Sequence, residues 1–218
     1  MQDDATPDVD LRKIIGFPPF KIERNDANMG FIRNVNQAAK RAKGDYLCLL
    51  NQDCKPIVTD WLDRMLVLAT TIPNVGIVGP KLLFPDGSIQ SCGGIFDGNK
   101  NPWHRYLGWK DATDWRVNTT EQVSWVTGAC ILIRRDDFWK CGGLDDVHYV
   151  DGYFDDVDLC LQVRHDLHKE VWYCAESMLE HAVGSTGGSK WFQHNLIAYH
   201  HKWDSKVTPD TPIIHAPW

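Results

Sequence analysis

Residues 34–79 read NVNQAAKRAKGDYLCLLNQDCKPIVTDWLDRMLVLATTIPNVGIVG, and this stretch decides the expected fold. Apolar residues recur at spacings of three and four over 34–43, which predicts a helix that Gly44 ends. The same spacing begins again at Trp61 and predicts a second helix that ends before Pro73.

Short segments around these helices are predicted as strands: FKIER at 20–24, YLCLLN at 46–51 and VGIVG at 75–79. The order strand, helix, strand, helix, strand is typical of a parallel sheet covered by helices. The sequence therefore predicts an α/β fold with a mostly parallel sheet, and ligands in such sheets bind at the carboxyl ends of the strands.

The rest of the chain continues the pattern and adds a small antiparallel hairpin. Pro-Asp-Gly lies between two strand-like runs in KLLFPDGSIQ at 81–90, whereas residues 97–120 are polar, aromatic and without a period. Further elements are expected in this order: a strand at 127–133, a helix at 155–167, a strand at 170–175 and a helix at 189–204.

Length and composition indicate a globular chain. With 218 residues, 43% of them hydrophobic and 24% charged, we expect a single domain over residues 1–218. The longest apolar runs, at 46–50 and 129–133, are far shorter than the roughly 20 residues that cross a bilayer. The acidic N-terminus lacks the pattern of a secretory signal, so a cytoplasmic protein is expected.

Charge and cysteine usage narrow the class of partner. The net charge is −6, and no run of Lys and Arg is long enough to contact a phosphate backbone along its length, so we expect no nucleic acid partner. An anionic ligand would then need a metal ion or local donors. The cysteines are seven, show no Cys-x-x-Cys spacing and are expected to be free thiols.

Two groups of acids are candidates for chemistry. Asp53 directly follows the predicted strand 46–51, where a sheet meets its ligand, although a turn-forming or capping aspartate would give the same pattern. Asp155, Asp156 and Asp158 open a predicted helix, where the helix dipole stabilises carboxylates by about 0.3–1 kcal/mol. Plain N-capping explains one or two of these three acids but not the whole group.

Two weaker signals follow in the second half. His181 lies after a strand in EHAVGS; it suits Mn²⁺ as the partner of an aspartate, but a surface histidine would read the same way. Gly128 and Ala129 lack bulk, so a ligand could approach the backbone there.

Taken together and in this order, these motifs resemble the inverting family 2 glycosyltransferases with the GT-A fold, notably rhamnosyltransferase-like members that build bacterial surface polysaccharides. The resemblance runs from DDATPD at 3–8 to about Trp203. It is carried by NMGFIRNVNQAAKRAKGDYLCLLNQD, WVTGACILIRRDDFWKCGGLDD, YFDDVDLCLQVR and EHAVGS.

The resemblance implies a role for each matching residue. Asp156 matches the catalytic base and Asp155 its acidic neighbour, while Asp53 and His181 match the ligands of Mn²⁺ or Mg²⁺. The implied donor-binding residues, which would contact a UDP- or dTDP-type nucleoside diphosphate sugar, are Asp3, Asp4, Asn28, Gly30, Asn51, Gly128 and Ala129. Residues 1–96 would form a partial nucleotide-binding half, and residues 97–218 an acceptor and catalytic half.

The front of the chain departs from the family pattern. Members begin with an apolar strand and a helix, whereas this sequence starts at the Asp-Asp turn that follows them. We therefore expect an N-terminally truncated sheet, whose unpaired backbone groups would each cost about 1–3 kcal/mol if buried. A second copy of this chain, in a homo-oligomer, or another protein could supply the missing strand, the sheet could close up, or the sequence could be a fragment.

The saccharide acceptor leaves the fewest signals. Trp103, Trp109 and Trp125 are candidates because aromatic faces cover sugar rings, although they could equally anchor loops. A lipid-linked acceptor would require peripheral membrane contact. Two alternatives stay open: a non-catalytic nucleotide-sugar or glycan binding module on the same fold, and a zinc module formed by His194, His200 and His201.

Overall fold

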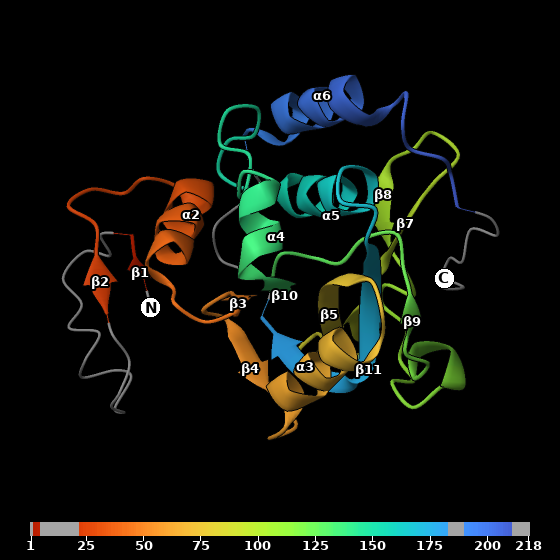
Figure 1. Ribbon diagram of the computed structural model, residues 1–218. Helices are drawn as coiled ribbons and strands as arrows, with labels where there is room; N and C mark the ends of the chain where they lie inside the picture. Colours follow the sequence, from red (N-terminus) through yellow and green to blue (C-terminus); the bar gives the residue numbers. More distant parts are fainter. Residues whose placement is uncertain (1, 5–21, 183–189, 211–218) are drawn as a thin grey trace.

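The computed structural model describes residues 2–4, 22–182 and 190–210 (Figure 1). The strands are β1 (Gln2–Asp3), β2 (Glu23–Arg24), β3 (Tyr46–Leu50), β4 (Cys54–Pro56), β5 (Val75–Leu83), β6 (Ile89–Ser91), β7 (Gly94–Phe96), β8 (Pro102–His104), β9 (Glu121–Gln122), β10 (Cys130–Arg134) and β11 (Glu170–His181). The helices are α2 (Phe31–Arg41), α3 (Trp61–Thr71), the 3₁₀ turn η1 (Trp115–Val117), α4 (Arg135–Lys140), α5 (Asp155–His165) and α6 (Phe192–Trp203).

The central sheet is mixed. Its strand order is β3-β10-β5-β11-β4, with β6 paired to β5 and β9 paired to β11. β5 and β11 pair in parallel, and β10 is antiparallel to both β3 and β5, so β3, β5 and β11 share one direction. The predicted α/β class is confirmed. β3 and β5 are not neighbours as their order along the chain suggested, because β10 lies between them.

Helices cover both faces of this sheet. In Figure 1, α3 lies on one side of β5 and β11, α5 lies on the other, and α6 lies outside α5. In β5, Ile77 packs into the core on the α5 side and Val78 into the core around Met65 of α3. Gly76 allows α5 to pack closely, because a Cβ there would lie 2.4 Å from Val163. α5 is buried on both sides, which explains why its sequence lacks a clean polar face.

Most predicted elements are present, with shifted ends. The hairpin is confirmed: β5 and β6 are antiparallel, and Gly87 takes a positive φ of 84° in the turn. The unpatterned stretch 97–120 contains only β8 and η1 as regular elements. No pattern in the sequence predicts α4 or β4. The strand predicted at 170–175 is longer in the structure, because β11 continues past an irregularity between Cys174 and Met178 as far as His181.

The front of the chain forms a small unit beside the central sheet. β1 and β2 pair in parallel as a separate two-stranded sheet, and β3 lies at the end of the central strand order. How the sheet is completed beyond β3 therefore stays a prediction. All seven cysteines are free, as expected. Within the described ranges, no helix is both long enough and apolar enough to cross a bilayer.

Candidate active site

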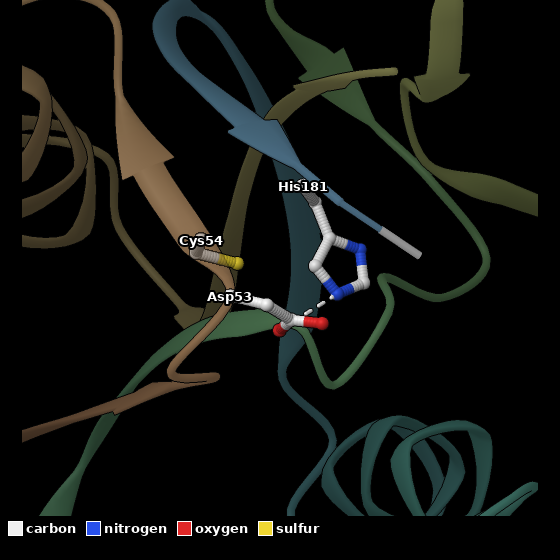
Figure 2. A group of neighbouring side chains, drawn as sticks. All are labelled: Asp53, Cys54 and His181. Atoms are coloured by element: carbon white, nitrogen blue, oxygen red, sulfur yellow. Dashed lines mark ion pairs between the residues drawn. The ribbon is translucent and has the colours of Figure 1, made fainter. Parts of the chain in front are cut away.

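An aspartate and a histidine meet at the end of the β4–β11 pair. The antiparallel register sets His181 opposite Cys54, and the Ala182 amide donates to the Asp53 carbonyl at 3.2 Å. The Asp53 carboxylate therefore faces the His181 ring, with Nε2 3.2 Å from Oδ1 (Figure 2). Because one residue ends β11 and the other directly precedes β4, ordinary strand pairing fixes their approach.

A glutamine of the hairpin orients the His181 ring. Gln90 is buried, and its Nε2 donates to the His181 carbonyl at 2.9 Å. Its Oε1 lies 2.6 Å from His181 Nδ1, and since Oε1 is an acceptor, Nδ1 carries the proton of this bond. Nε2 is thus the ring nitrogen that faces Asp53, and a partner on the other ring nitrogen is how histidine ligands are oriented in metal sites. Gln90 is not among the site residues predicted from the sequence, where its only signal is its place just after the predicted turn.

Cys54 completes a group of three possible ligands with Asp53 and His181, all within 4.8 Å of one another. Its thiol, however, donates to the Ala129 carbonyl at 3.3 Å. Burial, with the nearby Asp53 charge, raises the pKa of Cys54 to about 12, so the sulfur is protonated at neutral pH. The remaining oxygen and nitrogen donors fit a divalent ion such as Mn²⁺ or Mg²⁺ better than a thiolate-seeking ion.

The three acids at the start of α5 have different surroundings. Asp158 is fully buried and bonds to Trp203 Nε1 at 2.7 Å and to the Lys202 ammonium at 2.8 Å, so its role is structural. Burial and the neighbouring Asp156 charge raise the pKa of Asp155 well above its usual range. Burial also raises the pKa of Asp156, against the effect of its hydrogen bonds. The three residues are thus one structural acid and one pair of carboxyl groups with raised pKa values.

The segment at Gly128 and Ala129 joins the acid pair, Asp155 and Asp156, to Asp53 and His181, the metal-facing pair. The Gly128 amide donates to Asp156 Oδ2 at 2.7 Å. The next residue, Ala129, accepts at its carbonyl from the Asn51 amide at 2.9 Å, and Asn51 opens the turn that carries Asp53. A Cβ on Gly128 would lie 3.2 Å from the Asp156 Cβ, so the missing side chain makes room for Asp156. The approach of a ligand to the backbone at Gly128 and Ala129 stays a prediction.

The predicted donor residues at the front gather around the start of α2. Asp4 accepts from the Met29 amide at 2.8 Å and from the Gly30 amide at 3.0 Å. Asn28 also accepts from the Gly30 amide, at 3.1 Å. Gly30 has a φ of 82°, and a Cβ there would lie 2.6 Å from Asp151 Oδ1, just ahead of the acid pair. Asp3 lies in β1, and its side chain is outside the described residues.

The predicted acceptor tryptophans lie in different environments. Trp125 is only 4% exposed, packs on Gly94 and donates its indole N–H to the Ile95 carbonyl, which accounts for it as a core residue. Trp109 is half-buried under the Arg116 guanidinium, 4.5 Å from its ring centre. Trp103 is 48% exposed and therefore presents the largest free ring surface of the three.

The histidines near the C-terminus have other partners. His200 contacts Asp204 through Nδ1 at 2.7 Å and Asn101 through Nε2 at 3.1 Å. His194 packs edge-on against Trp191. Among the described residues, Asp53, Cys54 and His181 form the only group of three or more that could hold an ion, so the zinc module finds no support there.

Sequence comparisons give related proteins. The family described as "Glycosyl transferase family 2" matches residues 2–142. The chain is 35% identical over 179 positions to the uncharacterized protein y4gI of Sinorhizobium fredii, covering 77% of this chain and 20% of that protein. It is 32% identical over 158 positions to the O-antigen biosynthesis protein RfbC of Myxococcus xanthus, covering 69% of this chain and 12% of that protein. The chain thus spans a fifth or less of the length of these two relatives.

A third relative is the N-acetylglucosaminyl-diphospho-decaprenol L-rhamnosyltransferase of Mycobacterium tuberculosis. It is 26% identical over 223 positions, which cover 91% of this chain and 69% of that protein.

Solved structures share the fold. GalNAc-T7 with UDP, GalNAc and Mn²⁺ superposes with a TM-score of 0.70 at 16% identity, over 94% of this chain and 42% of that one. The mannosyltransferase PcManGT of Pyrobaculum calidifontis, in complex with GDP-Man and Mn²⁺, superposes with a TM-score of 0.63 at 15% identity, over 98% of this chain and 56% of that one. At these identities the likeness concerns the fold alone.

Proposed function

This chain belongs to glycosyl transferase family 2, and from that premise we propose that it moves a sugar, with inversion, from a nucleoside diphosphate sugar to an acceptor hydroxyl. Its fold is the GT-A fold of the solved relatives. The proposed donor is of the UDP or dTDP type, and the proposed acceptor is a saccharide or a lipid-linked saccharide. The proposed place of action is cytoplasmic, at the membrane periphery if the acceptor is lipid-linked.

One observation carries the proposal: the segment Thr127–Ala129 connects the acid pair to the metal-facing pair. Gly128 bonds to Asp156 on one side, and Ala129 bonds to the turn before Asp53 on the other. A donor whose diphosphate lies at Asp53 and His181 would therefore extend its sugar along this segment towards Asp156. Gly128 is partly exposed and has no side chain, whereas Ala129 is only 4% exposed, so such a ligand would meet the backbone of this segment at Gly128.

Asp53 Oδ1 and His181 Nε2 would hold Mn²⁺ or Mg²⁺, with Gln90 fixing the imidazole. The bound ion would supply positive charge for the diphosphate leaving group. Asp53 adds negative charge to the site, which favours a divalent over a monovalent cation. The neutral Cys54 thiol would line the site without contributing a ligand.

Asp156 is the proposed general base. Amides of Gly128 and Val157 hold its two oxygens at 2.7 and 2.8 Å, which leaves further lone pairs for an acceptor hydroxyl. A raised pKa makes a carboxylate a stronger base at neutral pH. Burial and the Asp156 charge raise the pKa of Asp155 well above its usual range. We therefore expect the pair to share one proton, with the negative charge on Asp156, whose oxygens accept from two backbone amides. Attack from the side opposite the leaving group then gives inversion in one displacement.

The remaining predicted site residues keep their roles as proposals with different structural support. Asp4, Asn28 and Gly30 shape the loop before α2, so Asp4 would act on the nucleoside through that loop. Trp103 is the acceptor candidate with an accessible ring. Trp109 lies under Arg116 and Trp125 is buried in the core, so both stay acceptor proposals with less free ring surface.

The testing experiment is a thermal-shift screen of nucleotide sugars with Mn²⁺ or Mg²⁺, followed by transfer and donor-hydrolysis assays on the donor that binds. A donor at 100 times its Kd raises stability by about 2.7 kcal/mol, which such a screen detects. Selective stabilisation with turnover supports the proposal. Selective stabilisation without turnover or hydrolysis would instead support the non-catalytic nucleotide-sugar binding module. No stabilisation by any nucleotide sugar would contradict both of these and leave only a glycan-binding module.

A further inference from the structure

The backbone just before the acid pair has an unusual conformation. Asp151, Gly152, Tyr153 and Phe154 follow one another with φ values of 55°, 88°, 66° and 69°. The left-handed region is unfavourable for residues that carry a Cβ, and here three of four consecutive residues carry one. Such a run persists only where the surrounding structure holds it in place.

One side chain from a distant helix makes most of the described polar contacts to this segment. Asn195 lies on α6 and has 0% exposure. Its Nδ2 donates to the carbonyls of Val150 at 2.9 Å and Gly152 at 2.6 Å, with a longer contact to Tyr153 at 3.3 Å. Its Oδ1 accepts from the Val150 amide at 3.1 Å. Both ends of the amide are therefore bonded to the backbone of residues 150–153, which overlaps the left-handed run.

The segment determines where the acid pair lies. Phe154 is the residue that precedes the first turn of α5, and α5 has no side-chain cap there, so the backbone at Phe154 sets where the helix begins. Asp155 and Asp156 are the first two residues of that helix. A change in the segment would move Asp156 relative to the Gly128 amide, which it meets at 2.7 Å.

We propose that Asn195 is a positioning residue for the transfer reaction: it holds the Val150–Tyr153 backbone so that Asp156 stands at Gly128 in the geometry that a base requires. The inference rests on the proposed function. Asn195 touches the backbone ahead of the acids and does not itself reach the reacting atoms. An apolar residue of similar size would fill the same volume on α6 but could not bond the carbonyls of this segment.

The test compares Asn195→Ala with Tyr199→Phe, a matched control on the same helix. Tyr199 is as buried as Asn195 and donates its hydroxyl to the Lys100 carbonyl at 2.7 Å, so the control removes a hydrogen bond of α6 and keeps the ring that stacks on Phe154. Asn195→Ser is the second, milder variant if Asn195→Ala does not fold. For each protein the kcat, the donor Kd and the Tm are measured.

We expect Asn195→Ala to lower kcat by about 10–100-fold, since misplacing a catalytic group by 1 Å costs on that order, with the donor Kd changed little. Tyr199→Phe should keep kcat within about 2-fold even at a similar loss of Tm, because its lost bond lies outside the segment. A kcat for Asn195→Ala no lower than that of the control would overturn the proposal. So would a loss of donor affinity that accounts for the whole defect.

A second readout does not depend on turnover. In ¹⁵N-labelled protein the Gly128 amide resonance reports the bond to Asp156, and it should shift in Asn195→Ala but not in Tyr199→Phe. An unmoved Gly128 resonance overturns the positioning role even if the wild type transfers no sugar. Wild-type inactivity with a shifted Gly128 resonance would instead overturn the proposed function and leave the structural link standing.

Discussion

The site has a metal-facing corner, formed by Asp53 and His181, and an acid corner, formed by Asp155 and Asp156, and the two are built in different ways. Regular strand pairing brings Asp53 and His181 together, because the β4–β11 register leaves the two residues little alternative. Asp155 and Asp156 instead follow four residues with positive φ, and a side chain about 40 residues further along the chain bonds to that segment. One half of the site therefore depends on sheet register, whereas the other depends on specific side-chain contacts to irregular backbone.

The largest effect is expected from Asp156→Asn, which removes the proposed base. Asp156→Asn keeps the size of the side chain but removes the base, so kcat should fall by about 10²–10⁴-fold while donor affinity stays within a few-fold. Steady-state turnover together with calorimetric donor binding measures both quantities. A variant that loses mainly donor affinity would show that Asp156 binds the donor rather than accepting a proton.

The second prediction breaks the metal-facing corner. Asp53→Ala should weaken Mn²⁺-dependent nucleotide binding by at least about 10–100-fold, the range that even outer-shell changes cause in metal sites. Calorimetry with and without Mn²⁺ separates this effect from metal-independent binding. Cys54→Ser is the control, because the thiol bonds to Ala129 and its loss should leave Mn²⁺ affinity nearly unchanged. Equal losses in both variants would make Cys54 a ligand and contradict the two-residue site.

The third prediction sharpens the role of the hairpin in the same corner. Gln90→Ala frees the His181 ring, and metal affinity should fall by roughly 10-fold, with kcat at saturating metal largely retained. Gln90→Glu keeps an acceptor for Nδ1 but cannot donate to the His181 carbonyl, so it should fall between wild type and Gln90→Ala. Metal titrations of turnover and of nucleotide binding provide the measurement. An unchanged metal affinity in Gln90→Ala would mean that sheet register alone fixes the histidine.

The smallest expected effect concerns stability at the acid corner. The folded state raises the pKa of Asp155, so the folded protein binds this proton more tightly than the unfolded chain does. Stability from this group is therefore lost as pH rises from the ordinary aspartate range through the raised pKa. Asp155→Asn removes that loss, so its Tm should exceed that of wild type at neutral pH. The expected rise is about 2–4 °C for each kcal/mol gained in the free energy of unfolding.

The Tm difference between Asp155→Asn and wild type should shrink as the pH falls towards 4, because both side chains are then neutral. Differential scanning calorimetry across this range checks the sign. A lower Tm for Asp155→Asn at neutral pH would show that a charged Asp155 stabilises the fold.

The same contrast explains how much the sequence could predict. Periodicity in residues 34–79 predicted both helices and the strands at 46–51 and 75–79, because apolar spacing reflects burial directly, but it did not predict β4. It could not show that β10 separates β3 from β5, since pairing between distant strands leaves no local signal. Strand-end position made Asp53 a candidate, and the structure sets it beside His181.

Other parts of the site had no readable pattern. Gln90 and Asn195 are single buried amides whose partners are backbone groups far away in the chain, so neither residue type nor spacing marks them. Trp125 drew attention because of its residue type, but its ring and N–H are used in the core. The left-handed run from Asp151 contains one glycine, and a single glycine in a turn-rich stretch does not indicate four such residues.

The central claim is that both corners act on one ligand, and Mn²⁺ itself tests this most directly. Mn²⁺ is titrated into ¹⁵N-labelled protein with the nucleotide sugar that the thermal screen selects, and paramagnetic broadening is followed for each amide. We expect the Asp53 and His181 amides to broaden most, the Gly128 and Val157 amides to broaden with them, and Asp53→Ala to abolish all four effects. Broadening centred elsewhere, or confined to Asp53 and His181 while Gly128 and Val157 stay sharp, would contradict a shared site.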